Sequence, residues 1–138
     1  MSARIALTDR DPNGLAEMLA GLLEANLMAH PRRASLLRPA VVEIEVVDAD
    51  VGATVRFSPG VVEIANGPAT PRAEVHVRAR AQDLLAMAAA PLLFGLPDPL
   101  RRDGRSVLGR LVRRHVRISG MLRHPIVLSR FARLLSVV

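Results

Sequence analysis

The sequence predicts an α+β fold in which a five-stranded, mainly antiparallel sheet carries helices packed on one face. Apolar residues near both ends of the chain recur every three or four positions, as on the buried side of a helix. Between Val41 and Ala79 they alternate instead with polar residues, the pattern of strands that bury one face. The length of 138 residues suits one core, so we expect residues 1–138 to form one domain.

A first helix is predicted from Asp11 to about His30. The Asp11 side chain would cap the free amides of the first turn, and Pro12 suits the first helical position because its missing N–H is not needed there. Pro31 ends the helix, and residues 32–39 are expected to form another short turn. Residues at three- and four-residue spacing form the predicted buried side: Leu15, Met18, Leu19, Leu22 and Leu23.

Four strands are predicted next, at about residues 41–46, 51–57, 62–64 and 73–79. Turn formers such as Ser58-Pro59-Gly60 separate them. Because the connections are short, we expect all four strands to form an antiparallel meander. The alternation places Glu43, Glu45 and His76 on the solvated outer face, which explains the two glutamates better than a pair of catalytic carboxylates does.

The C-terminal part is predicted to add helices and a fifth strand. A helix opens at Ala81 and runs through Ala90, and an apolar segment interrupted by prolines follows at 91–99. Residues 105–114 have the pattern of an amphipathic helix, and residues 116–118 that of a short strand. The last helix begins near Pro125 and is expected to bury Val127, Leu128, Phe131, Leu134 and Leu135.

Three segments stand in a characteristic order between about residue 40 and the end of the chain. They are Gly60-Val61-Val62-Glu63-Ile64 after a tight turn, Ala73-Glu74-Val75-His76-Val77 followed by Asp83-Leu84-Leu85-Ala86-Met87, and His115-Val116-Arg117-Ile118-Ser119-Gly120 before the final helix. In this order they resemble the sterol carrier protein type 2 (SCP2) domain. The resemblance implies that a sheet and its helices enclose an apolar tunnel for a fatty acyl chain, a sterol or a similar lipid, without catalytic residues. The chain departs from the family's pattern in the long, basic stretch between Ala90 and His115, and at Met121-Leu122-Arg123-His124, where a small or acidic residue commonly follows the glycine.

The apolar residues after position 83 exceed what one short helix needs to bury. Prolines and Gly95 break this segment, and four alanines at 86 and 88–90, with only three aromatic residues in the chain, leave room for an acyl chain. For each residue alone, an ordinary core position is the competing interpretation. Together with the resemblance, they predict a pocket between the sheet and the helices that begin near Gln82 and Pro125. The predicted lining is Leu84, Leu85, Met87, Leu92, Leu93, Phe94, Met121, Val127, Phe131 and Leu134.

Patterns of catalysis and metal binding are missing from the sequence. The four histidines share no local motif with a serine or an aspartate, and no two of them have the helical spacing of metal ligands. There is no glycine-rich phosphate loop. The absence of cysteine excludes thiol catalysis and cysteine-bound metal. We therefore expect a protein that is not an enzyme and has no metal or cofactor.

Positive charge is concentrated at the C-terminal end. Residues 1–98 hold nine arginines and twelve acidic residues, a net charge of −3, whereas residues 99–138 hold ten arginines and one acidic residue, a net charge of +9. The asymmetry is either functional or a result of an arginine-rich, lysine-free composition. In the first case, an anionic membrane or a partner enzyme would meet the polar side of the helix at 105–114, formed by Arg105, Arg110, Arg113 and Arg114.

The composition favours lipid over nucleic acid as the ligand. Single-strand binders usually add stacking aromatic residues to their basic surface, but this chain has no tyrosine or tryptophan. The sequence therefore predicts a lipid-binding or lipid-transfer protein. The first alternative is an accessory or scaffold protein that presents a lipid-like substrate to an enzyme, and the second is a nucleic-acid binder. We expect a cytoplasmic protein, peripheral to a membrane at most, because residues 1–13 lack the apolar core of a signal peptide and no apolar run approaches the ~20 residues of a bilayer span. The sequence leaves the ligand and the oligomeric state open.

Overall fold

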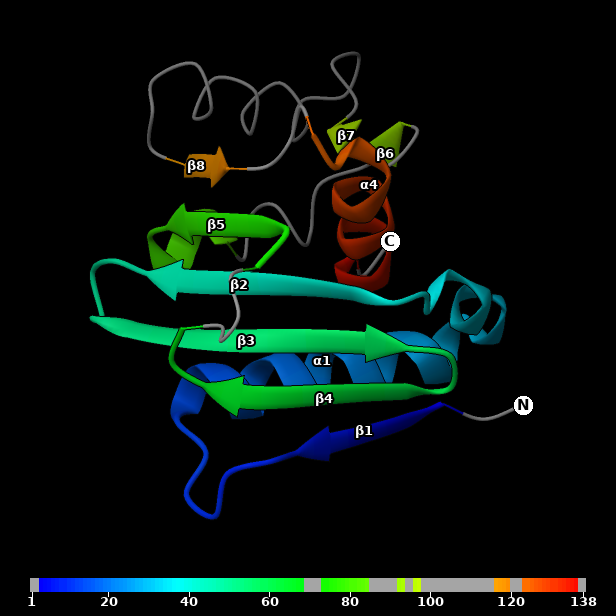
Figure 1. Cartoon of the computed structure of the whole chain (residues 1–138), viewed down its shortest axis with the longest axis horizontal. Coiled ribbons are helices and arrows are strands. Elements are labelled where there is room, and N and C mark those ends of the chain that lie inside the picture. Colours follow the sequence, from blue (N-terminus) through cyan, green and yellow to red (C-terminus); the bar gives the residue numbers. More distant parts are fainter. Residues whose placement is uncertain are drawn as a thin grey trace.

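The computed structural model describes residues 3–68, 73–84, 92–93, 96–97, 116–119 and 123–136, with residues 92–93, 96–97 and 116–117 described by their backbone (Figure 1). This part of the chain forms a mixed sheet with two long helices on one face. The elements, in order, are β1 (Arg4–Leu7), α1 (Gly14–Ala29), the 3-10 helix η1 (Pro31–Leu36), β2 (Ala40–Val46), β3 (Val51–Ser58), β4 (Val61–Asn66), β5 (Val75–Ala79), β6 (Leu92–Leu93), β7 (Leu96–Pro97), β8 (Val116–Ser119) and α4 (Pro125–Leu135).

The main sheet has six strands in the order β1-β4-β3-β2-β5-β8, and β6 and β7 form a separate two-stranded hairpin. Three neighbouring pairs of the main sheet are antiparallel and two, β1 with β4 and β2 with β5, are parallel. The α+β class and the mainly antiparallel sheet are confirmed. The described sheet has one strand more than predicted, because Arg4–Leu7 adds to the free edge of β4.

The predicted meander of four strands ends after three. β2, β3 and β4 are joined by tight turns, one of them with Gly60 at a φ of +76°, where a side chain would be strained. β5 does not return beside β4 but lies parallel to β2, with Ile44 opposite Val77. The connection after β4 spans residues 67–74, which is long enough for β5 to reach the free edge of β2.

One face of the sheet and the inner sides of α1 and α4 form a continuous core. Most of the described strand residues predicted to point inward are buried, whereas Val51, Ala73 and Ile118 are half-buried. The ring of Phe57 meets that of Phe131 edge to face, with centroids 5.9 Å apart. α1 differs from the prediction on its buried side, because Met18 is 36% exposed while Ala16 and Ala20 are buried. Small residues at these positions bring the helix backbone close to the sheet. The buried apolar residues of the two helices are Leu15, Ala16, Leu19, Ala20, Leu23, Leu128, Phe131, Leu134 and Leu135.

The start of α1 was predicted two residues too early. The cap is Asn13 and not Asp11, because Asn13 Oδ1 accepts the Ala16 N–H at 2.8 Å. Asn13 also ties the helix to the sheet, since its Nδ2 donates to the Gly52 carbonyl at 2.9 Å and its N–H donates to Asn66 Oδ1 at 2.8 Å. Asp11 contributes its backbone carbonyl, which accepts from Asn66 Nδ2 at 2.9 Å. Asp11 could cap a helix equally well by itself. Asn13 is the cap because it also bonds to Gly52 and Asn66, far along the chain.

The other predicted elements have different outcomes. The end of α1 near His30, the short turn after it, the fifth strand and the last helix are confirmed by α1, η1, β8 and α4. The helix predicted from Ala81 is described only at 81–84, and the helix predicted at 105–114 lies outside the described residues. Among the helices that the structure describes, none is long and apolar enough to cross a membrane.

Candidate functional site

An apolar hollow of about 380 Å³ opens at the end of the sheet where α1 begins. Three elements form it: the first turns of α1, the turn between β2 and β3, and the helical turn at 81–84. Its volume lies in the range typical of small-molecule sites, ~300–1,000 Å³. Among the residues that the structure describes, no charged or polar side chain lines it: the lining residues are Gly14, Leu15, Met18, Val46, Ala49, Val51, Ala81 and Leu84.

Local contacts position the residues that surround the apolar hollow. Val46 and Val51 are the last paired residues of the β2–β3 hairpin, and Ala49 lies in the turn between them. Ala81 is anchored beside this turn, because its N–H donates to Asp48 Oδ1 at 3.0 Å. Leu84 is 5% exposed and Met18 is 36% exposed, so the hollow has a covered wall and an open rim. The side chains that meet here can exclude water from an apolar group but offer it no hydrogen bond.

The predicted lipid-site residues fall into three groups. Leu84 lines the apolar hollow, next to α1 and the β2–β3 turn and not next to α4, and its role in lipid binding stays a prediction. Phe131 and Leu134 are buried in the core, and Val127 is half-buried against it, so their described contacts are those of core packing. The role of the others as pocket lining stays a prediction, because their side chains lie outside what the structure describes: Leu85, Met87, Leu92, Leu93, Phe94 and Met121.

The hollow also contains residues that the sequence analysis did not select. Met18 was assigned to the buried side of α1, and Val46 and Val51 to the strands. The sequence contained one signal for Met18. The apolar residues of α1 cover more than one narrow face of the helix, so some of them cannot contact the sheet. No local sequence pattern predicts that Met18, Val46 and Val51 lie near Leu84, because their proximity depends on the path of the chain after β5.

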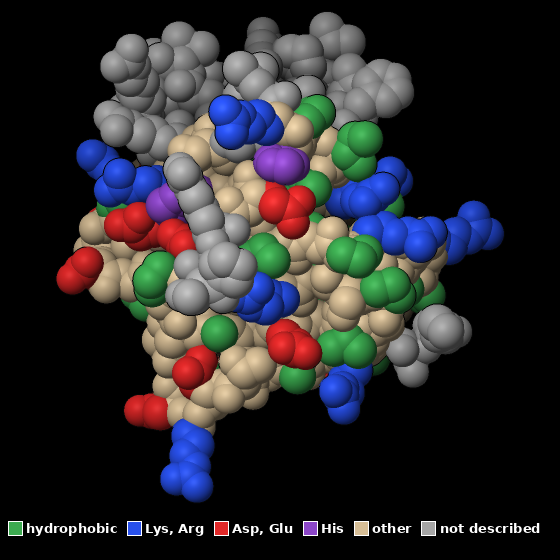
Figure 2. Space-filling model, in the orientation of Figure 1, with side chains coloured by type: hydrophobic (Ala, Val, Ile, Leu, Met, Phe, Trp, Pro, Cys, Tyr) green, Lys and Arg blue, Asp and Glu red, His purple; other side chains and the backbone are tan. Residues whose placement is uncertain are grey.

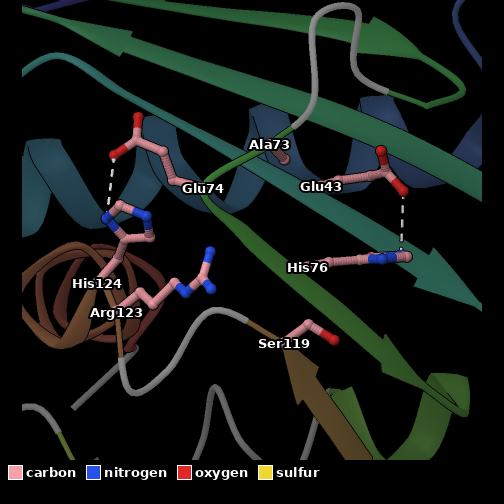
Figure 3. A pocket seen from close by; sticks show the side chains of 7 residues that line it. All are labelled: Glu43, Ala73, Glu74, His76, Ser119, Arg123 and His124. Atoms are coloured by element: carbon pink, nitrogen blue, oxygen red, sulfur yellow. Dashed lines mark ion pairs between the residues drawn. The ribbon is translucent and has the colours of Figure 1, made fainter.

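A larger and polar hollow, of about 590 Å³, opens on the other face of the sheet (Figure 3). The sheet register places Glu43, His76 and Ser119 side by side on β2, β5 and β8. Glu74 precedes β5, and Arg123 and His124 precede α4. The described lining is Glu43, Ala73, Glu74, His76, Ser119, Arg123 and His124.

Two histidine–glutamate pairs lie in this polar hollow. His76 Nε2 lies 3.0 Å from Glu43 Oε2 and 3.4 Å from Glu45 Oε2, but off the line that a hydrogen bond requires. His124 Nδ1 lies 3.8 Å from Glu74 Oε2, and Glu74 Oε1 accepts the Val41 N–H at 3.2 Å. The side chain of Glu43 is only 17% exposed, so this carboxylate is more covered than the predicted solvated face implies.

The polar hollow lacks the contacts of a nucleophilic site. Ser119 is exposed and, among the residues that the structure describes, it donates no hydrogen bond to His76. The contacts are those of an ion-pair network, which continues from Glu45 Oε2 to Arg78 Nε at 3.1 Å. Within the described ranges, no group of three or more histidine and acidic side chains is arranged to hold a metal ion.

The predicted arginine surface lies outside the described residues: no side chain of Arg105, Arg110, Arg113 or Arg114 is described. Of the ten C-terminal arginines, side chains are described for three, Arg123, Arg130 and Arg133. The proposed role of the 105–114 surface therefore stays a prediction.

A comparison with solved structures relates this fold to a known protein. The solved structure of the "UbiJ-SCP2 Ubiquinone synthesis protein" superposes with a TM-score of 0.61 at 18% sequence identity, and the match covers 88% of this chain and 92% of that one. No protein-family model and no curated protein sequence matches the chain. At this identity the likeness concerns the fold, and it confirms that the chain has an SCP2-like fold.

Proposed function

We propose that this protein binds a long apolar ligand, of the fatty acyl, sterol or isoprenoid type, between its sheet and helices, and releases it unchanged. The observation that carries the proposal is the apolar hollow at Leu84, which lies in an SCP2-like fold and whose described lining has no charged or polar side chain. A site of this kind favours a ligand through burial and not through polar recognition.

The driving force follows from the lining. Each methylene group removed from water contributes ~0.8 kcal/mol, before the cost of ordering the ligand. A few methylene groups in the hollow therefore give weak binding, and a chain that continues along the core side of the sheet gives tighter binding. The predicted lining residues between Leu85 and Phe94 would extend the site in this way.

A second candidate is an accessory protein that presents a lipid-like substrate to an enzyme. The similar solved structure is that of a ubiquinone synthesis protein, which favours this candidate. Ubiquinone carries a long isoprenoid tail, and a tail of this type suits a site that is apolar throughout. The two candidates share the ligand chemistry and differ in whether the ligand passes to a membrane or to an enzyme.

Two methionines of α1 allow a matched test. Met18 borders the apolar hollow, whereas Met28, on the same helix, lies outside it and is 77% exposed. A Met18→Trp substitution fills the hollow from its rim. We expect it to weaken uptake of the fluorescent fatty acid cis-parinaric acid about tenfold in a titration without vesicles, whereas Met28→Trp keeps uptake within about twofold of wild type.

The thermal unfolding midpoint of each variant serves as the folding control. Leu84→Arg, which places a charge against the covered wall of the hollow, is a second variant for the same comparison. Equal uptake by folded Met18→Trp, Leu84→Arg and wild type would overturn this placement of the ligand. A wild-type protein that takes up no probe would overturn the function itself.

A further inference from the structure

Basic side chains gather at the end of the sheet opposite to the apolar hollow. The register places Arg4, which pairs with Val61, at the same end as Ala40, which pairs with Phe57. η1 and the last residues of α1 and α4 lie at this end as well. We call it the basic end and define it by Arg4, Arg32, Arg33, Arg38 and Arg133.

The charges of the described residues are distributed unevenly along the strands. In Figure 2 a group of basic side chains projects on the right, where η1 lies, with no acidic side chain among them, whereas basic and acidic side chains are mixed on the left. The opposite end has the acidic turns, with Asp9 and Asp11 before α1 and Asp48 and Asp50 between β2 and β3, and it also carries Arg10 and Arg80. Such a separation orients the protein in the field of a charged surface.

Two arginines of the basic end are held close together. Burial lowers the pKa of Arg33, and the positive charge of Arg133 lowers it further. Arg33 Nη1 donates to the Ser136 carbonyl, which fixes its guanidinium at the end of α4. The fold thus brings two positive charges to the same end of the molecule, where they add to the positive potential of the other arginines.

An exposed apolar patch lies among these charges. A hollow of about 410 Å³ between β1, α1 and η1 is lined by apolar residues and one glutamate: Ala3, Ile5, Glu24, Leu27, Met28, Pro31 and Ala34. Arg4 flanks Ile5, and Arg32 and Arg33 lie between Pro31 and Ala34. Met28 is 77% exposed, so a large flexible apolar side chain protrudes beside arginines.

We propose that the basic end docks on an anionic lipid membrane, with Met28 entering the interface and the arginines contacting lipid phosphates. The combination of a protruding apolar side chain with surrounding positive charge is typical of proteins that rest on such membranes. Nucleic acid is the weaker candidate because Phe57 and Phe131 are buried and no described aromatic ring is available for stacking. This inference rests on the proposed function, since a lipid carrier must meet a membrane to exchange its ligand. The docking surface itself is separate from the apolar hollow.

Co-sedimentation with vesicles tests the proposal. The whole chain is incubated with vesicles of phosphatidylcholine alone or of phosphatidylcholine with phosphatidylglycerol. We expect binding to the anionic vesicles only, and Arg32→Glu with Arg38→Glu, both exposed, should weaken it about tenfold or more. Arg10→Glu with Arg80→Glu changes the net charge equally at the opposite end and should weaken it about twofold or less.

Two further variants sharpen the result. Met28→Gln removes the apolar side chain without changing charge and should weaken vesicle binding about threefold. Reversal of Arg110, Arg113 and Arg114 to glutamate tests the competing surface predicted from the sequence. The proposal is overturned if only this triple variant loses binding, if the two double variants lose it equally, or if neutral vesicles bind as well as anionic ones.

The outcomes separate this inference from the proposed function. Uptake of cis-parinaric acid without vesicles should be unchanged in Arg32→Glu with Arg38→Glu, because these side chains lie outside the lining of the apolar hollow. Normal uptake with no vesicle binding by the wild type overturns the docking surface alone. Binding of a single-stranded oligonucleotide that the same double variant abolishes, with no vesicle binding, assigns the basic end to nucleic acid instead.

Discussion

α1 has an exposed methionine towards each end, and the surroundings of the two differ. Met18 borders a hollow without charged lining, next to the acidic turn between β2 and β3. Met28 protrudes beside the arginines of η1. Met18 thus lies at a site lined by apolar residues, whereas Met28 lies among positive charges that attract phosphate groups. Under the two proposals, the length of α1 separates the ligand site at one end from the membrane contact at the other.

Each end of α1 is also fixed by an asparagine. Asn13 caps the first turn and bonds to Gly52 of β3, whereas Asn26 is buried and its Nδ2 donates to the Leu134 carbonyl at 3.0 Å. That carbonyl lies in the last turn of α4, where the helix itself supplies no donor. One end of α1 is therefore tied to the sheet and the other end to α4.

The largest expected effect comes from breaking these two links. Asn26→Ala should lower the free energy of unfolding by ~2 kcal/mol, because it leaves a buried carbonyl without its donor. Asn13→Ala should lower it by ~1 kcal/mol, the usual value of a helix cap near the surface. Urea unfolding followed by circular dichroism measures both. A larger loss for Asn13→Ala would mean that the sheet, and not α4, holds α1 more firmly.

Salt should separate the two ends without any substitution. Raising its concentration from ~0.1 M to ~1 M shortens the Debye length from ~10 Å to ~3 Å. We expect vesicle binding to fall about tenfold, because it depends on exposed arginines, and uptake of cis-parinaric acid to change less than about twofold, because it depends on apolar burial. Parallel titrations at both concentrations give the comparison. Salt-sensitive uptake would place charge in the ligand site.

The smallest effect concerns the arginine pair of the basic end. Arg133→Gln removes the positive charge that opposes protonation of Arg33. The unfolding midpoint should therefore stay the same or rise slightly, while affinity for anionic vesicles falls a few-fold. Differential scanning fluorimetry and co-sedimentation measure the two quantities on one sample. A fall in both would show that Arg133 stabilises the fold and would contradict its assignment to the docking surface.

The sequence predicted the helices and strands better than it predicted which of them contact one another. Alternation along β2 to β5 and the spacing of leucines in α4 are local signals, and the buried faces follow them. The pairing of β5 with β2 is not local, since it depends on where the connection after Asn66 leads. β1 was missed because Arg4–Leu7 is short and pairs along one edge only, with β4. The choice of Asn13 over Asp11 as the cap likewise depends on Gly52 and Asn66, far along the chain.

The candidate site shows the same limit. Leu84 was predicted because an apolar excess follows it in the sequence. Met18 and Val51 were assigned to core positions, since only the fold shows that they meet Leu84 around a hollow. The basic end was not predicted at all, because its arginines are spread between Arg4 and Arg133 and no sequence window contains more than a few of them.

Native mass spectrometry of the wild-type protein, purified without added lipid, tests the central claim most directly. We expect a species heavier than the chain by the mass of a long apolar molecule, and we expect Met18→Trp, prepared in parallel, to carry less of it. A clean mass of the chain alone, together with no uptake of cis-parinaric acid, would contradict lipid binding.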